Sequence, residues 1–243
     1  MAVIPTRNEA PSISASVTSL LSQDYPGTLS VIVVDDNSAD GTADIARAAA
    51  GTNVDKLSII SGMPLAEGWS GKLWAVNQGI EGSQNSDGSS KFILLTDTDI
   101  THTPGNLHWL VGKAEISALD LVSEMVMLRC QSFWEKLLVP AFIFFFQKLY
   151  PFRQVNNPKN SLAAAAGACI LVRRKALKMA EEIAVIKDRL IDDCSLAALI
   201  KANAPIWLGL IERAHSLRMY DRLGEIWHMV ARTAFVQLDH SLL

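Results

Sequence analysis

The feature that most constrains the fold is a nearly continuous apolar run from Leu29 to Asp35, LSVIVVD. A strand can be apolar on both faces only when both faces are covered, as in the centre of a parallel sheet. Similar short runs, separated by stretches with helical periodicity, recur through the first hundred residues. We therefore expect strands at 2–5, 29–35, 57–61 and 92–96, and helices at 12–23, 42–50 and 71–80. This alternation predicts an α/β fold with a mostly parallel central sheet flanked by helices, and ligands beyond the carboxyl ends of the strands.

The second half of the chain is less regular, but no linker divides it from the first half. Strands are expected at 121–128 and 168–172, and helices at 132–149, 194–202 and 223–238. A length of 243 residues suits one large domain, so we interpret residues 1–243 as a single domain.

The composition argues against several classes of protein. The formal net charge is -3, whereas proteins that bind nucleic acids carry a basic surplus, so no nucleic-acid partner is expected. Hydrophobic residues make up 49% of the chain and charged residues 19%, which is enough apolar material for a buried core. The three cysteines and five histidines lack the spacing of metal ligands or of a disulfide framework.

The most apolar window is 137–146 (LLVPAFIFFF), with Lys136 before it and Lys148 after it. A helix needs about 20 apolar residues to cross a bilayer, so we expect the chain to be soluble or to lie at a membrane surface. A helix over about 132–152 would suit either the membrane interface or the protein core. The interface is favoured because the run is apolar on all sides.

Asp97-Thr98-Asp99 comes directly after the apolar run FILLT. Residues i and i+2 of an extended chain point to the same side, so the two carboxylates converge at the end of a central strand. Their mutual repulsion is relieved when a cation lies between them, and oxygen ligands suit a hard ion such as Mg²⁺ or Mn²⁺. The alternative interpretation is a solvated turn after the strand.

Polar loops follow two other predicted strands. Asp36, in VDDNS, could accept a hydrogen bond from a nucleobase or ribose, or could serve the turn and N-cap of the next helix. Arg7, in PTRNE, offers a planar cation for stacking or for phosphate, or lies in a polar helix start. A further acidic pair, Asp192-Asp193, opens a predicted helix, where acids also suit the helix dipole.

Taken together, these loops resemble the motifs of the family 2 glycosyltransferases, which have the GT-A fold. The family pattern is P-x-[R/Y]-N-E, V-D-D-x-S, D-x-D and E-D-x-x-L, and this chain has PTRNE, VDDNS, DTD and DDCSL in that order. A closer resemblance is to the hopene-associated glycosyltransferases, a bacterial branch, in stretches such as SGMPLAEGWSGKLWAVNQG and LVPAFIFFFQKLYPF. It implies a Rossmann-like GT-A domain with a nucleotide-binding half at 1–100 and an acceptor-side half at 101–243.

The resemblance also implies a role for each matching residue. The nucleotide would be bound by Pro5, Arg7, Glu9, Asp36 and Asp97. The metal, Mg²⁺ or Mn²⁺, would be bound by Asp99 together with Asp97, and Asp193 occupies the position of the catalytic base. The diphosphate or the acceptor would be contacted by Asp192 and Arg232. Lys72 could likewise reach the diphosphate, or could simply be an exposed lysine near a helix start. Gly167 would either let the backbone approach a ligand closely or serve packing alone.

The implied reaction is an inverting transfer of the hexosyltransferase type. A sugar would pass from a nucleotide sugar, by resemblance a UDP-sugar, to a hydroxyl group of a lipid acceptor, which in this branch is a hopanoid. The implied place of action is cytoplasmic, at the inner face of the bacterial cytoplasmic membrane.

The sequence departs from the family pattern in three ways. The usual E-D pair is Asp192-Asp193, and the tryptophan that follows the arginine of the Q/R-x-x-R-W motif is missing after Arg232, which argues against polymer synthesis. Members of the branch usually carry transmembrane helices, so this sequence would be a fragment or a truncated gene product.

Two rival functions use the same kind of fold. A nucleotidyltransferase would show a Gly-rich basic loop after the first strand, which PTRNEAPS is not. A non-catalytic homologue that only binds nucleotide sugar or lipid would not need Asp97, Asp99 and Asp193, and all three are present.

Overall fold

The computed structural model describes residues 1–82, 90–180, 183–188 and 192–237. The strands are β1 (Ala2–Thr6), β2 (Val31–Asp35), β3 (Leu57–Ser61), β4 (Phe92–Thr96), β5 (Ile100–His102), β6 (Leu121–Met127), β7 (Cys169–Arg173) and β8 (Ile206–Ser216). The α-helices are α1 (Ala10–Leu21), α2 (Thr42–Ala49), α3 (Gly71–Gly82), α4 (Asn106–Ile116), α5 (Phe133–Leu149), α6 (Phe152–Val155), α7 (Arg174–Met179), α8 (Asp192–Lys201) and α9 (Leu223–Gln237). Short 3-10 helices cover Gly51–Lys56 and Ile183–Ile186.

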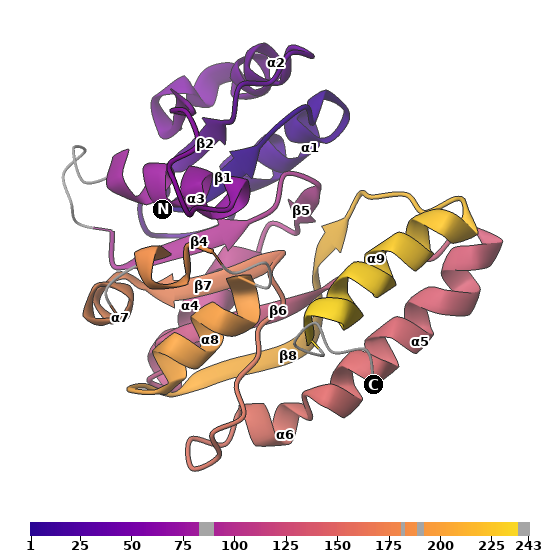
Figure 1. The fold of residues 1–243 in the computed structure, drawn as a ribbon. Coiled ribbons are helices and arrows are strands. Elements are labelled where there is room, and N and C mark those ends of the chain that lie inside the picture. The colour runs from indigo at the N-terminus through magenta and orange to yellow at the C-terminus, as the bar shows by residue number, and fades with distance from the viewer. Residues whose placement is uncertain (83–89, 181–182, 189–191, 238–243) are drawn as a thin grey trace.

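All eight strands form one sheet in the order β3-β2-β1-β4-β7-β6-β8-β5, with helices on both faces (Figure 1). The four strands of the first half, β3-β2-β1-β4, are parallel. Successive side chains of β1 alternate between two cores, with Ala2 and Ile4 on the face of α1 and Val3 on the face of α3. The expected α/β fold with a central sheet between helices is therefore confirmed.

The direction of the strands changes beside β4. β7 pairs antiparallel with both β4 and β6, β8 runs parallel to β6, and β5 lies antiparallel to β8 at the edge. The expectation of a mostly parallel sheet thus holds for the first half, whereas the second half is mixed. The sequence does not predict β5, β8 or α4, because β5 has only three residues and β8 interrupts its apolar pattern with Gly209 and charged residues.

Helix α3 lies unusually close to the sheet because of Gly79. A Cβ atom at this position would lie 2.6 Å from Val3 and 3.0 Å from Val34, both in the core of the sheet. The close approach brings the first turn of α3, with Lys72, to the carboxyl ends of β1 and β4.

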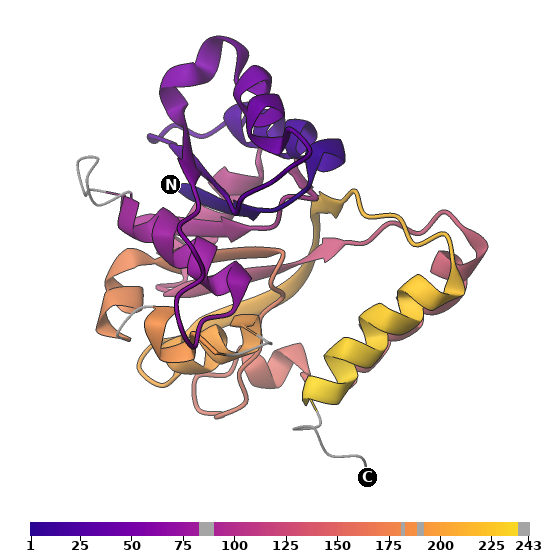
Figure 2. The same ribbon diagram turned by 45° about the horizontal axis from the view of Figure 1, so that its top comes forward.

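Helices α5 and α9 lie side by side and extend away from the sheet, most clearly in Figure 2. We call this pair the helical arm. Only Glu135, Val139 and Phe146 of α5 are buried, so the interpretation of this segment as a buried core helix is wrong. The arm exposes large apolar side chains, namely Phe133, Leu137, Phe144, Phe145, Leu149, Leu223 and Trp227. Within the described residues, no helix has both the length and the apolar character needed to span a bilayer.

The base of the arm is fixed by Glu135, whose side chain is fully buried. Its carboxylate accepts hydrogen bonds from the backbone N–H groups of Gln131 and Ser132, both at 2.8 Å, and of Tyr220 at 2.9 Å. The Ser132 hydroxyl completes a capping box by accepting from the Glu135 N–H at 3.2 Å. Burial alone would raise the pKa of Glu135, but the three N–H donors outweigh it and lower the pKa from 4.5 to about 2.

Replacing Glu135 with Gln should lower the free energy of unfolding by about 1–3 kcal/mol at pH 7, because a charged acceptor of three N–H groups is lost. A carboxyl group with a lowered folded-state pKa stabilises the fold above its ordinary pKa of 4.5, and this contribution disappears as the pH falls to about 2. Urea unfolding should therefore show the difference between wild type and Glu135→Gln shrinking over that range. A difference that stays constant with pH would contradict the assignment.

Candidate functional site

A cleft with a volume of about 590 Å³ opens at the carboxyl ends of β1, β2 and β4. Seven of the residues predicted from the sequence to bind a ligand line this single cleft: Pro5, Arg7, Glu9, Asp36, Lys72, Asp97 and Asp99. They come from the loops after three parallel strands and from the start of α3. This is the place where an open α/β sheet is expected to bind its ligands.

The loops after β1 and β2 are joined to each other by hydrogen bonds through Asn8. The Asn8 N–H donates to the Ser38 hydroxyl at 2.9 Å, and its side-chain oxygen accepts from the Ala39 N–H at 2.8 Å. Asn8 adopts a left-handed backbone with a φ of 54°. Its neighbour Arg7 forms an ion pair with Asp36 at 3.1 Å across the two loops.

Asp36 and Ser38 do not cap the next helix. The N-cap of α2 is Gly41, and no side chain caps it. The N-cap part of the alternative interpretation is therefore wrong, although the loop does form turn hydrogen bonds such as that from the Asn37 side-chain amide to Asp36. The side chain of Asp36 also lines the cleft.

Asp97, Thr98 and Asp99 all line the cleft, and Thr98 is the buried residue between the two acids. The Thr98 hydroxyl donates to the carbonyl oxygen of Pro5 at 2.8 Å, which ties the segment after β4 to the end of β1. Residues 97–99 form a turn after β4, in which the Ile100 N–H donates to the carbonyl oxygen of Asp97 at 3.2 Å, so they are not the extended i, i+2 stretch that the sequence predicts. The turn of the alternative interpretation is present, but it is not solvated at Asp99, whose side chain is only 14% exposed.

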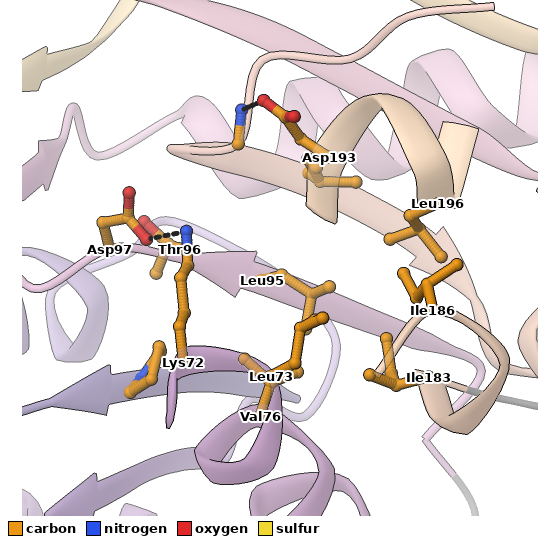
Figure 3. Close-up of a pocket in the computed structure, with 13 residues that line it drawn as sticks. Lys72, Leu73, Val76, Leu95, Thr96, Asp97, Ile183, Ile186, Asp193 and Leu196 are labelled. Carbon is orange, nitrogen blue, oxygen red and sulfur yellow. Dashed lines mark hydrogen bonds and ion pairs between the residues drawn. The ribbon is translucent and has the colours of Figure 1, made fainter. Parts of the chain in front are cut away.

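Each of the two carboxylates has a cationic partner. The Lys72 ammonium group lies 2.8 Å from Oδ1 of Asp97 (Figure 3). Oδ2 of Asp99 accepts from the Ser216 hydroxyl at 3.2 Å and from Nε of Arg218 at 3.1 Å. Like charges gathered on one sheet edge are thus balanced by cations from α3 and from the segment after β8.

These carboxylates suit a divalent metal with oxygen ligands. Within the described contacts, Oδ2 of Asp97 and Oδ1 of Asp99 accept no hydrogen bond, so each acid keeps one oxygen for a metal. Among the described residues no group of three or more His, Cys, Asp or Glu side chains forms a closed metal site. An incomplete protein shell fits Mg²⁺ or Mn²⁺ held by one or two carboxylates and by substrate phosphates.

Asp193 lies in a smaller pocket beside the cleft, shown in Figure 3. The two hollows share Pro5, Lys72 and Asp97 as lining residues. Oδ2 of Asp193 accepts from the Gly167 N–H at 2.8 Å, and Oδ1 accepts from the Cys194 N–H at 2.7 Å. The carboxylate of Asp193 is therefore held in this smaller pocket, next to the cleft.

Gly167 allows this close contact with Asp193. A Cβ atom on Gly167 would lie 3.1 Å from Oδ2 of Asp193, which is tighter than ordinary van der Waals contact. Close packing at Gly167 is therefore present, and the approach of this backbone to a ligand stays a prediction. Asp192 and Arg232 lie within α8 and α9, but their side chains fall outside the described residues.

The sequence analysis missed two residues that contact the predicted metal ligand, Ser216 and Arg218. Ser216 is the last residue of β8, and Arg218 lies two residues beyond it. Because the sequence does not predict β8, the sequence pattern gives no reason to place either residue near Asp99. Arg218 also reaches Glu9 through its second terminal nitrogen at 3.3 Å. Burial works to lower the pKa of Arg218, but the carboxylate of Asp99 outweighs burial and raises it, so this side chain stays charged.

Comparison of the chain with known protein families gives one match. Residues 1–179 match the family described as Glycosyl transferase family 2. No curated protein sequence matches the chain.

Solved structures with the same fold cover essentially the whole chain. A mannosyltransferase from Pyrobaculum calidifontis, in complex with GDP-Man and Mn²⁺, is 20% identical with a TM-score of 0.71, and the match covers 100% of this chain and 64% of that one. TarS from S. aureus with UDP-GlcNAc is 19% identical with a TM-score of 0.56, covering 100% of this chain and 67% of that one. Glucosyl-3-phosphoglycerate synthase from Mycobacterium tuberculosis, with Mn²⁺, UDP-Glc and phosphoglyceric acid, is 17% identical with a TM-score of 0.57, covering 98% and 78%.

Asn8 offers a test of how the loops after β1 and β2 are joined. Asn8→Gly keeps the left-handed backbone but loses the bond to Ala39, so the free energy of unfolding should fall by about 1 kcal/mol. Asn8→Ala loses the same bond and adds the strain of a left-handed backbone, about 1–2 kcal/mol more. Urea unfolding of both variants measures the order of stability, and an Ala variant as stable as wild type would contradict it.

Proposed function

Because the chain belongs to glycosyl transferase family 2, we propose that it transfers a sugar from a nucleotide-sugar donor to an acceptor hydroxyl group. The observation that carries this proposal is the gathering of acids and cations from three loops and α3 around one cleft. Relatives of the same fold have been solved with GDP-Man, UDP-GlcNAc or UDP-Glc, which supports a nucleotide sugar as donor.

The nucleoside would lie over the loops after β1 and β2. Pro5 and Arg7 offer an apolar ring and a planar cation beside the base, and Asp36 offers a carboxylate to base N–H or ribose hydroxyl groups. The Asn8 bonds that join the loops hold these groups at a fixed spacing. We propose a UDP-sugar as the donor.

The diphosphate would lie toward Lys72, Asp97 and Asp99. Asp97 and Asp99 would hold a divalent metal, Mg²⁺ or Mn²⁺, as the Mn²⁺ in two of the relatives suggests. Bound there, the metal would act as a Lewis acid that stabilises the charge of the departing diphosphate. Lys72, which already lies against Asp97, would offer a cation to a phosphate oxygen.

Asp193 is proposed as the general base of an inverting transfer. Its carboxylate would take the proton from the acceptor hydroxyl while the oxygen attacks the anomeric carbon and the nucleoside diphosphate leaves. The N–H groups of Gly167 and Cys194 fix the orientation of this carboxylate, which is a requirement for a positioned base.

We propose a lipid acceptor, in keeping with the resemblance to the hopene-associated branch. The helical arm supports this choice, because it exposes Phe144 (56%) and Phe145 (64%) together with the flanking cations Lys136 and Lys148. Apolar side chains bordered by lysines are typical of a helix that lies in a membrane interface. The inner face of the bacterial cytoplasmic membrane is the proposed location.

Asp193→Asn should lower the rate of transfer by about 10²–10⁴-fold, because general-base assistance is lost. The variant keeps a hydrogen-bond acceptor for Gly167, so binding of UDP with Mn²⁺ should be unchanged in a thermal-shift assay. The transfer assay measures UDP release from UDP-Glc and UDP-GlcNAc with a hydroxylated hopanoid as acceptor.

A matched control is Asp44→Asn, which removes an exposed carboxylate from α2 that pairs with Arg47. Its transfer rate should equal that of wild type. Normal turnover by Asp193→Asn would refute the assignment of the base. Nucleotide binding without any turnover in the wild type would instead indicate a non-catalytic homologue.

The membrane proposal is tested by flotation with anionic vesicles of phosphatidylglycerol and phosphatidylcholine. Wild type should float with the vesicles, and Phe144→Ser combined with Phe145→Ser should reduce the bound fraction at least about tenfold, given about 1.5–3 kcal/mol for each buried apolar side chain. Ile116→Ser is the control, because Ile116 is 89% exposed on α4, outside the arm. Equal flotation of the double variant and the wild type would refute a role for the arm.

A further inference from the structure

The cleft contains a nearly balanced set of charges before any ligand is present. Its lining includes four carboxylates, those of Glu9, Asp36, Asp97 and Asp99, and three cations, those of Arg7, Lys72 and Arg218. Each cation lies within 3.3 Å of at least one of these carboxylates. The lining therefore carries a single net negative charge, because three of its four negative charges are balanced by cations of the protein itself.

Arg218 contacts two acids of the cleft that come from different segments of the chain. Arg7 pairs with Asp36 in the nucleoside part of the cleft, whereas Arg218 contacts both Glu9 and Asp99. It thus bridges the loop after β1 and the segment after β4. Its partner Asp99 is the carboxylate that we assign to the metal, so a metal at Asp99 would lie close to the guanidinium group.

The positive charge of Arg218 disfavours the binding of a metal ion without a nucleotide. A divalent cation adds two positive charges beside a guanidinium group that is already paired with Asp99, and like charges repel strongly at such short range. A metal that arrives with a diphosphate brings two negative charges as well, and the sum in the cleft stays unchanged. The diphosphate also offers the guanidinium group a bidentate partner in place of the carboxylates.

We propose that Arg218 exchanges partners when the donor binds: its guanidinium group leaves Asp99 and Glu9 for the diphosphate oxygens and so removes the positive charge that disfavours a metal at Asp99. The proposal rests on the proposed donor and metal, and it adds a residue and an order of events to them. Arg218 is therefore a binding residue that couples the affinity for metal to the affinity for nucleotide.

The anchoring of the chain around Arg218 permits this exchange without movement of the sheet. The Leu217 N–H donates to the carbonyl oxygen of Asp99 at 2.7 Å, and Ile100 pairs with Ser216 between β5 and β8. The Arg218 side chain itself is 50% exposed and lines the cleft. A long side chain on a fixed backbone can reorient from carboxylate to phosphate within the same cleft.

The test measures Mn²⁺ and nucleotide separately on the whole chain. Free Mn²⁺ is titrated by electron paramagnetic resonance without nucleotide, and UDP and GDP are titrated by calorimetry at saturating Mn²⁺. Arg218→Gln should bind Mn²⁺ alone about two- to tenfold more tightly than wild type, because the competing guanidinium group is gone. The same variant should bind the preferred nucleotide about tenfold or more weakly, because a charge-assisted bond to the diphosphate is lost.

The opposite signs of the two effects separate this role from a structural one, since a damaged cleft would weaken both ligands. Arg218→Lys keeps the charge without the planar fork, so both affinities should fall between those of wild type and Arg218→Gln. Arg222→Gln, an exposed arginine just before α9, should leave both affinities unchanged.

Two outcomes overturn the proposal and are distinguishable. If wild type binds Mn²⁺ and nucleotide but Arg218→Gln does not tighten the binding of Mn²⁺, the role of Arg218 is refuted while the proposed function stands. If wild type binds neither UDP nor GDP in the presence of Mn²⁺, the proposed function fails and the exchange fails with it.

Discussion

Carboxylates that gather at the carboxyl ends of neighbouring parallel strands repel one another, and the rest of the site is arranged around that repulsion. Cations from separate elements of the fold offset this repulsion. Lys72 arrives on the first turn of α3, which Gly79 allows to lie directly on the sheet. Arg218 lies just after β8, which pairs with β5 beside Asp99 at the edge of the sheet. The folding of the second half thus supplies a charge that the first half needs.

The segment between β8 and α9 joins the cleft to the helical arm. At one end, Ser216 and Arg218 bond to Asp99 in the cleft. At the other end, the Tyr220 N–H donates to the buried carboxylate of Glu135, and the Ser132 hydroxyl donates to the carbonyl oxygen of Tyr220 at 3.1 Å. The capping box that begins α5 and the acids of the cleft are therefore connected through a few residues. The position of the arm relative to the cleft is consequently fixed by hydrogen bonds and does not depend on the packing of apolar side chains alone.

The parts of the fold that the sequence predicts are those where one local pattern decides the structure. Strands β1, β2 and β4 are short apolar runs buried on both sides, and β3 and β4 have the bounds that their patterns predict. Asp97 and Asp99 lie in the turn directly after β4, so the end of that strand brings both acids to the cleft. Strand β8 escapes prediction because it lies partly exposed, so no apolar period marks it. Arg218 is missed for the same reason: its role depends on a pairing between β5 and β8 across more than a hundred residues, which no local pattern encodes.

The change from parallel to antiparallel strands beside β4 explains how Asp193 comes near Asp97. A parallel neighbour would bring its own carboxyl end to the cleft, whereas the antiparallel β7 brings the segment that precedes it. Cys169 of β7 pairs with Thr96, the residue before Asp97, so Gly167 lies at the same edge of the sheet. Asp193 bonds to the Gly167 N–H, and the small size of that glycine sets how closely the carboxylate can approach. The register of a single antiparallel pair therefore determines the spacing between the proposed base and the proposed metal ligands, which lie almost a hundred residues apart in the sequence.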